Sequence, residues 1–174
     1  LTAETVINTF SEKELEKIFW EYGEERAARK IARAIFERRK EKKIVSTTDL
    51  AGIIEKVVGR RGKLHPATLI FQALRIYIND ELNVLRKAIE VAIDKLSAGG
   101  RIEVISFHSL EDRIVKDMFR EAAKQSHVNE YIKSKEPSKI KVLTKKPITA
   151  SNEEIRKNPR SRSAELRIGE KGRI

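Results

Sequence analysis

The stretch that decides the fold is Gly99-Gly100-Arg101-Ile102-Glu103-Val104-Ile105-Ser106-Phe107-His108-Ser109-Leu110-Glu111-Asp112. Its two glycines can take positive φ and so close the helix that precedes them. Apolar side chains then fall on both faces of one short segment, at Ile102, Val104, Ile105 and Phe107. Strands that helices cover on both sides of a parallel sheet have this composition. The stretch therefore predicts an α/β fold with a strand buried on both faces.

The end of this stretch predicts a polar site. Ser109 can cap the helix that follows, with Asp112 at its third position. His108 and Ser109 then lie at the carboxyl end of a buried strand, where open α/β sheets hold their ligands. A helix cap beside a surface histidine explains the same residues, and the spacing alone leaves both interpretations open.

Composition restricts the class of protein. The 174 residues suit one domain or two small ones, and a hydrophobic content of 40% is enough for a core. The chain has no cysteine, so it forms neither disulfides nor thiolate metal sites. No apolar run approaches the roughly 18 residues that span a bilayer, and no secretion signal is seen. We expect a cytoplasmic protein.

The net charge of +11 makes a polyanion the expected partner. The charge is uneven, because residues 133–174 carry a net +8 and residues 81–132 a net −1. A solvated basic extension is the alternative, but this tail also has the alternating pattern of strands.

Residues 1–77 predict a helical unit with no strand pattern. Ser11 and Glu14 form a capping-box pair before a helix that Gly23 ends. A second helix runs from about 24 to 39, and a third from Ser46 or Thr47 to Gly59. Three further amphipathic helices follow along the chain. The fourth helix has the apolar residues Ile70, Phe71, Leu74 and Ile78. The fifth has Leu82, Leu85, Ile89, Ala92 and Leu96, and the sixth has Leu110, Ile114, Val115, Met118 and Ala122.

A basic loop separates the third helix from the fourth. Arg60, Arg61 and Lys63 surround Gly62, and Pro66 stands at the start of the next helix. Three cations beside flexible backbone suit a phosphate contact, whereas an ordinary solvated loop accounts equally well for them. His65 has no second ligand nearby and is expected to be structural or exposed.

The tail predicts two strands, at 140–148 and 164–168, after a polar loop at 125–139. Between them, Arg160 and Arg162 alternate with serines. If this turn is extended, both side chains leave the same face and can bind adjacent phosphates of one RNA strand. The alternative is that one arginine pairs with a carboxylate such as Glu153 or Glu154 and only pins the turn.

The strand inventory is incomplete for an α/β sheet. A strand that is apolar on both faces is typical of a parallel sheet. The chain, however, has about three predicted strands, and two of them form a terminal antiparallel pair. No Gly-x-Gly sequence occurs, and no acidic residue ends a strand where a cofactor ribose is held. The pattern indicates the later part of an α/β domain behind a helical block.

Several motifs together resemble one family. They are Glu21-Tyr22-Gly23-Glu24-Glu25-Arg26, His65-Pro66-Ala67-Thr68, Phe71-Gln72-Ala73-Leu74-Arg75-Ile76, Asn79-Asp80-Glu81-Leu82, Gly99-Gly100-Arg101, Ile105-Ser106-Phe107-His108-Ser109-Leu110-Glu111-Asp112-Arg113 and Asn158-Pro159-Arg160-Ser161-Arg162-Ser163-Ala164. In this order they resemble the RsmH (MraW) family of bacterial ribosomal RNA small-subunit methyltransferases over essentially the whole chain.

The resemblance implies the later part of a class I Rossmann-like methyltransferase, with an all-helical inserted domain at 1–77 and catalytic-domain elements at 78–174. It implies methyl transfer from S-adenosylmethionine to N4 of a cytosine in 16S ribosomal RNA, on the small ribosomal subunit. The family's cofactor motifs lie upstream, so no residue here is assigned to the cofactor, to catalysis or to a metal. The resemblance implies no membrane partner and leaves a homodimer open. A non-catalytic basic RNA-binding or ribosome-associated module is the alternative, and an upstream glycine-rich loop distinguishes the two.

The residues that we assign to RNA or substrate binding are His108, Ser109, Arg160, Arg162, Arg60, Arg61 and Lys63.

Overall fold

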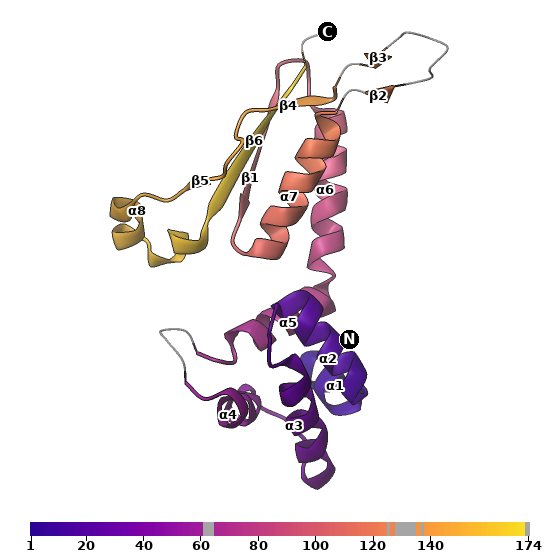
Figure 1. Ribbon diagram of the computed structural model, residues 1–174, viewed down its shortest axis with the longest axis vertical. Coiled ribbons are helices and arrows are strands. Elements are labelled where there is room, and N and C mark those ends of the chain that lie inside the picture. Colours follow the sequence, from indigo (N-terminus) through magenta and orange to yellow (C-terminus); the bar gives the residue numbers. More distant parts are fainter. Residues whose placement is uncertain (61–64, 125, 128–134, 137, 173–174) are drawn as a thin grey trace. The chain divides into compact units, whose positions relative to one another are not determined.

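The computed structural model describes residues 1–60, 65–124, 126–127, 135–136 and 138–172 (Figure 1). The chain divides into two compact units, Leu1–Glu81 and Leu82–Ile174, and each is described by itself. This boundary lies four residues beyond the one expected after residue 77. Within the described ranges, no helix is both long enough and apolar enough to span a lipid bilayer.

The first unit, here called the helical unit, contains five helices in its described residues (Figure 1). They are α1 (Ala3–Thr9), α2 (Glu12–Gly23), α3 (Ala28–Glu41), α4 (Thr47–Val58) and α5 (Thr68–Asn79). The capping box of Ser11 and Glu14 is present at α2, and Ser46 caps α4 as expected. The apolar faces meet in one core, whose largest fully buried members are Phe19, Leu15, Ile31, Ile35, Ile54, Ile70 and Leu74.

Helix α1 was not expected from the sequence, although its signals are present. Thr2 caps it by accepting a hydrogen bond from the N–H of Thr5, and Val6 and Ile7 are buried. Asn8 fixes it to the α3–α4 connection, because its amide donates to the carbonyl of Ile44 and accepts from the N–H of Ile44. Seven residues are too few for the helical period to stand out.

Gly23 does not take the left-handed conformation that would end α2; Glu24 takes it instead, with φ 49°. Gly23 is required for another reason. A Cβ at this position would lie 2.8 Å from the carbonyl oxygen of Leu69 and 3.3 Å from Cβ of Ala73. Helices α2 and α5 therefore approach so closely at Gly23 that no larger residue fits without a shift.

The second unit, here called the sheet unit, begins with α6 (Glu81–Lys95) and places α7 (Ser109–Ala122) after the first strand. Its strands are β1 (Arg101–Ser106), β4 (Ile140–Val142), β5 (Ile148–Thr149) and β6 (Glu165–Lys171), and β2 (Ser126–His127) pairs with β3 (Lys135–Glu136). The order is β1-β6-β4, with β5 also on β6, and every pair is antiparallel. Gly99 takes positive φ (76°) in the turn before β1.

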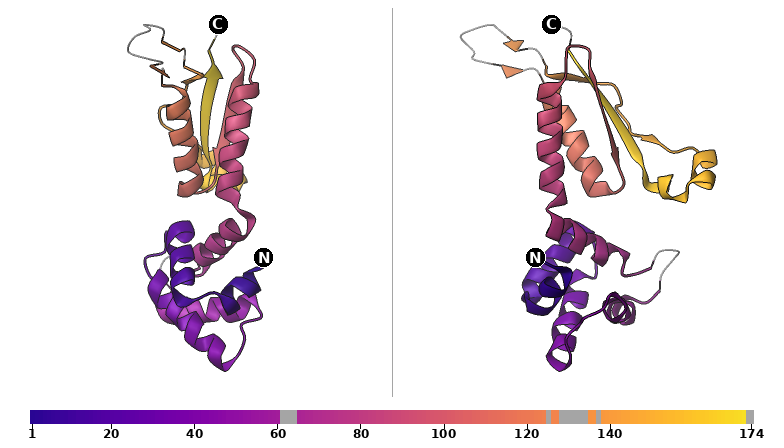
Figure 2. Two further views of the ribbon diagram at one scale, coloured as in Figure 1. Left: turned by 90° about the vertical axis from the view of Figure 1, so that its right-hand side faces the viewer. Right: turned by 180° about the vertical axis from the view of Figure 1, so that it is seen from behind.

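Helices α6 and α7 cover one face of this sheet (Figure 2). The core between them contains Ile89, Ile93, Ile102, Ile114, Val115, Phe119 and Ile140. The antiparallel terminal pair expected from the tail is present as β4 and β5 against β6. Residues 140–148 form two short strands rather than one, and β5 starts directly after Pro147, as expected of a residue without an N–H.

The expectation that β1 is buried on both faces is wrong for this chain. Ile102 and Ser106 face the helices and are buried, whereas Ile105 is 57% exposed and Phe107, just beyond the strand, is 55% exposed. The cause is that both helices lie on one side. Register then places Ile105 beside Leu166 and Leu166 beside Ile148, which is 52% exposed. A row of apolar side chains therefore crosses the uncovered face on three strands.

The alternation predicted in the last strand is present. Arg167 and Gly169 of β6 are buried toward the helices, and Leu166 and Ile168 lie on the other face. Arginine is seldom buried unless it is paired. Here it is paired, with Asp112 of α7.

Candidate functional site

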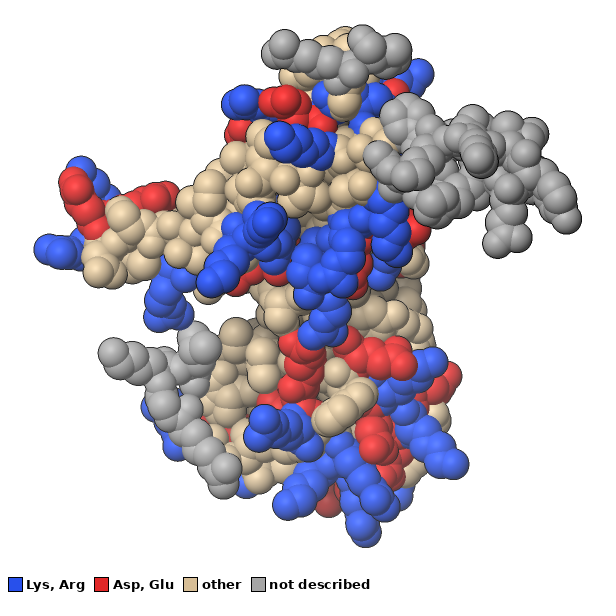
Figure 3. All heavy atoms as spheres, turned by 45° about the horizontal axis from the view of Figure 1, so that its top comes forward, with Lys and Arg blue, Asp and Glu red and all other residues tan. Residues whose placement is uncertain are grey.

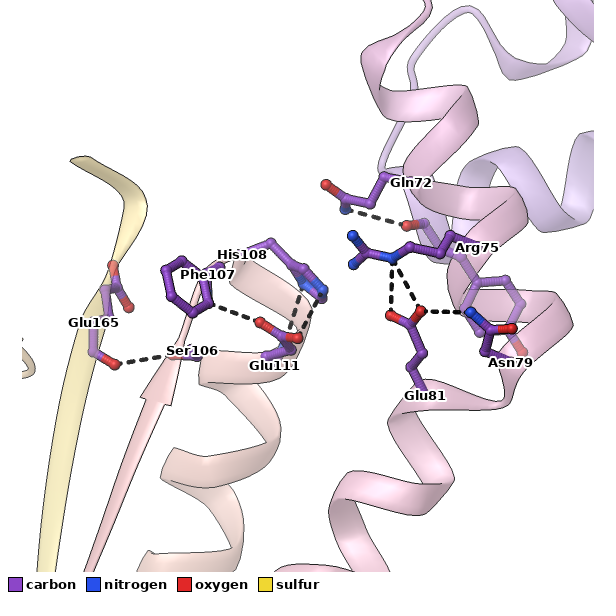
Figure 4. A network of polar contacts seen from close by, with 10 residues as sticks. Gln72, Arg75, Asn79, Glu81, Ser106, Phe107, His108, Glu111 and Glu165 are labelled. Carbon is purple, nitrogen blue, oxygen red and sulfur yellow. Dashed lines mark hydrogen bonds and ion pairs between the residues drawn. The ribbon is translucent and has the colours of Figure 1, made fainter. Parts of the chain in front are cut away.

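The carboxyl end of β1 is built from hydrogen bonds (Figure 4). Ser106 is buried, and its Oγ donates to the carbonyl oxygen of Glu165 at 3.2 Å. The N–H of Phe107 donates to Oε2 of Glu111 at 2.7 Å. These bonds hold the turn from β1 into α7, so the polar strand end that the sequence predicts is a fixed structure.

His108, and not Ser109, is the cap of α7. The helix starts at Ser109, His108 has an extended backbone, and its Nδ1 accepts a hydrogen bond from the N–H of Glu111 at 3.3 Å. A ring nitrogen can accept this bond as a serine oxygen does. The sequence pattern indicated the neighbouring Ser109 because serine is a preferred cap residue. The cap interpretation of this stretch is thus right about the role and wrong about the residue.

The His108 side chain is only 11% exposed, so it is not the surface histidine that the sequence left open. Its Nε2 is buried and lies 3.3 Å from Oε1 of Glu111, off the line of a well-formed hydrogen bond. Burial raises the pKa of the Glu111 carboxyl, but contacts with His108 and the N–H of Phe107 outweigh it and bring the pKa below its usual value. Glu111 therefore stays ionised and keeps the turn closed at neutral pH.

A buried ion pair that was not predicted from the sequence joins α7 to β6. Arg167 donates from Nε and Nη2 to the two oxygens of Asp112, at 2.6 and 2.8 Å. Hydrogen bonds from Arg167 lower the pKa of Asp112 more than burial raises it. Burial and the charge of Asp112 raise the pKa of the nearby Glu165. Asp112 is more than a first-turn carboxylate, because it ties the helix to the sheet across 55 residues.

Arg160 and Arg162 lie in a 3-10 helix, η1 (Pro159–Ser163), and the expectation of an extended turn is wrong. Pro159 fixes the first φ, and Asn158 accepts from the N–H of Arg160 and from Ser161 Oγ. Since a 3-10 helix has three residues per turn, positions two apart do not share a face. The two side chains therefore leave different faces of η1.

Both arginines are nevertheless exposed, and Ser161 between them is buried. Within the described residues neither has an ion pair or hydrogen bond from its side chain, and Glu153 pairs with Lys157 instead. The two arginines are thus available to a ligand from outside the chain.

The basic loop is only partly described. Arg61 and Lys63 lie outside the described residues, and Arg60 is an exposed side chain that pairs with Glu55. Nδ1 of His65 accepts from the N–H of Ala67, which agrees with a structural histidine. Arg60 belongs to the helical unit, whereas His108, Ser109, Arg160 and Arg162 belong to the sheet unit.

The family model described as "MraW methylase family" matches residues 1–172. The chain belongs to the MraW methylase family. The resemblance seen in its motifs is confirmed.

Three of its relatives carry the name "Ribosomal RNA small subunit methyltransferase H". The protein from Synechocystis sp. is 52% identical over 174 residues, which cover 98% of this chain and 51% of the relative. The one from Persephonella marina is 50% identical over 173 residues, with 98% and 55% covered. The one from Dictyoglomus thermophilum is 49% identical over 171 residues, with 98% and 52% covered. The chain spans about half the length of the curated relatives it matches.

The sequence has no Gly-x-Gly loop. In the described ranges, no group of three His, Asp or Glu side chains is arranged to hold a metal ion.

Proposed function

We propose that the protein carrying this chain transfers a methyl group from S-adenosylmethionine to N4 of a cytosine in 16S ribosomal RNA, in the cytoplasm. The observation that carries the proposal is the family match over residues 1–172, together with relatives named as small-subunit ribosomal RNA methyltransferases. The basic net charge of +11 agrees with an RNA substrate.

This chain would form the later part of a Rossmann-like catalytic domain, behind a helical domain inserted into it. The edge of β1 supports this placement, since the only strand that pairs with β1 in the described residues is β6. Preceding strands of the sheet can add to that edge in parallel. The uncovered row of Ile105, Leu166 and Ile148 would then receive a second layer of helices.

The cofactor supplies an electrophilic methyl group. The exocyclic amine of cytosine is a poor nucleophile, because its lone pair is delocalised into the ring, so the base has to be extruded and oriented. In this chain, His108 and Glu111 would fix the strand end beside that base, with Ser109 at the start of α7. Arg160 and Arg162, together with the loop of Arg60, Arg61 and Lys63, would hold RNA phosphates.

A non-catalytic RNA-binding module is the second candidate, which the charge alone also supports. It does not explain why a sheet edge and an apolar sheet face are left open. The genomic sequence upstream of Leu1 distinguishes the two, because an enzyme requires an in-frame glycine-rich cofactor loop there.

The decisive experiment is to delete the complete gene and measure N4-methylated cytidine in 16S ribosomal RNA by mass spectrometry. We expect the modification to disappear and to return with the complete reading frame, but not with residues 1–174 alone. Calorimetry should detect no micromolar binding of S-adenosylmethionine to the 174-residue chain. Unchanged methylation after deletion would reject the proposed activity.

A further inference from the structure

A groove of the sheet unit lies between α7 and the segment that follows β4, and none of the residues assigned above to RNA or substrate binding lines it. It has a volume of about 290 Å³. Its lining includes Phe119, which is a buried core residue, and Arg167, which pairs with Asp112. Four further cations line it: Lys116, Arg120, Lys124 and Lys145. Figure 3 shows lysine and arginine side chains gathered over this part of the molecule.

Three of the cations form a row. Lys116 and Arg120 stand four residues apart on α7, about 6 Å along the helix axis. Lys124 follows four residues later, just beyond the end of the helix, and lines the same groove. Lys145 faces this row from the other side of the groove. A row of cations suits an extended polyanion better than one small anion.

These charges are available to a ligand. Lys116 and Lys145 form no ion pair with any carboxylate in the described residues. Among the described residues, Arg120 and Lys124 pair only with exposed carboxylates of α7, Asp117 at 4.0 Å and Glu121 at 2.6 Å. Exposed pairs of this kind contribute little stability, so exchanging them for a phosphate costs little.

The groove also offers a neutral donor. Oγ1 of Thr144 accepts a hydrogen bond from the N–H of Ile168 at 2.9 Å, which leaves its hydroxyl hydrogen free to donate. Cations and hydroxyl donors are the groups that contact the sugar-phosphate chain of a nucleic acid.

We propose that this groove binds the sugar-phosphate backbone of the RNA substrate at a second place, separate from the strand end and from η1. The proposal rests on the proposed function for the identity of the polyanion. The order β1-β6-β4 places the groove beside β4, at the opposite edge from β1, so strands added to β1 leave it open.

The test uses the protein expressed from its complete reading frame and 16S ribosomal RNA, with affinity measured over a series of salt concentrations. In Lys116→Ala/Lys145→Ala we expect weaker binding. Each lost phosphate contact lowers the slope of log affinity against log salt by about 0.7 to 0.9. Two lost contacts should therefore lower it by about 1.4 to 1.8.

Lys87→Ala/Lys95→Ala is the matched control, because it removes the same charge from exposed positions of α6 outside the groove. We expect its slope to stay near that of the unaltered protein. Equal slopes for the two double variants would overturn the proposal. So would a groove variant that loses affinity for whole small subunits but not for naked RNA, because the groove would then contact a ribosomal protein.

Methyl transfer by the unaltered protein is measured in parallel and separates the two proposals. A protein without methyl transfer, whose RNA binding still depends on the groove, refutes the proposed enzyme and keeps the groove. A protein that methylates RNA, but whose groove variant binds RNA like the control, supports the proposed enzyme and refutes the groove.

Discussion

The two units differ in where they leave apolar side chains exposed. In the helical unit the large exposed ones are single residues on separate segments, such as Trp20 of α2, Val45 and Leu69 of α5. In the sheet unit Ile105, Leu166 and Ile148 are neighbours on three adjacent strands, and two of them are more than half exposed. Scattered apolar residues are ordinary on protein surfaces, whereas a contiguous row requires a cover.

The two units therefore differ in how much of their apolar surface their own helices and strands cover. The helical unit closes its core with its own five helices. The sheet unit has helices on one face only and a strand, β1, with one neighbour in the described residues. Five measurements, in order of decreasing expected effect, test this difference.

The largest effect is expected when the units are separated. Residues 1–81 should give a helical circular dichroism spectrum and one cooperative thermal transition, because their core is internal. Residues 82–174 should self-associate through the uncovered row, which ultracentrifugation measures. Ile105→Thr/Ile148→Thr should reduce that association. A monomeric, cooperatively folded 82–174 would contradict the view that its sheet lacks a cover.

Asp112→Asn should destabilise the sheet unit by about 3 kcal/mol, because it leaves the buried Arg167 without its charged partner. Chemical denaturation measures this loss. Asp117→Asn on the same helix is the control, because Asp117 is exposed and its contact with Arg120 is long, at 4.0 Å. This substitution should cost less than about 1 kcal/mol. Equal losses in the two variants would show that the buried pair contributes no more stability than the exposed pair.

The same pair makes stability depend on pH. The pKa of Asp112 is lower in the folded than in the unfolded protein, so its contribution is present at neutral pH. It should be lost as the pH falls below the ordinary aspartate value of about 3.9 toward the folded value. In Asp112→Asn the acid limb of the stability profile should therefore be less steep.

Two glycine variants test the helical unit. Gly23→Ala should cost about 1 to 3 kcal/mol, because the new Cβ would lie 2.8 Å from the Leu69 carbonyl oxygen. Gly52→Ala in α4 should instead stabilise by about 0.5 to 1 kcal/mol, since nothing lies within 4 Å of its Cβ. Thermal unfolding measures both, and the same sign for the two would contradict the close approach of α2 and α5.

The smallest effect on stability is expected at η1. Arg160→Ala/Arg162→Ala should leave the melting temperature unchanged, because neither side chain has a partner in the described residues. In the complete protein it should weaken RNA binding and lower its salt slope by about 0.7 to 0.9 per arginine, with cofactor affinity unaltered. A lower melting temperature with unaltered RNA binding would make the arginines structural.

The sequence by itself determined the helices, most of their caps, the antiparallel strands of the tail and the family. These features depend on side chains a few residues apart, such as Ser11 with Glu14, or on motifs read in order. It missed α1, whose seven residues are too short to display a period.

Only the tertiary structure decided which faces are buried and which polar groups meet. The register between β1 and β6 joins residues about 60 positions apart, and it turns Arg167 inward to Asp112 and Ile105 outward. The cap at His108 and the 3-10 helix at Arg160 likewise depend on backbone geometry that several residue types can satisfy. Burial depends on what packs against a strand. The apolar residues on both faces of β1 show that either face can be buried, but not which one is.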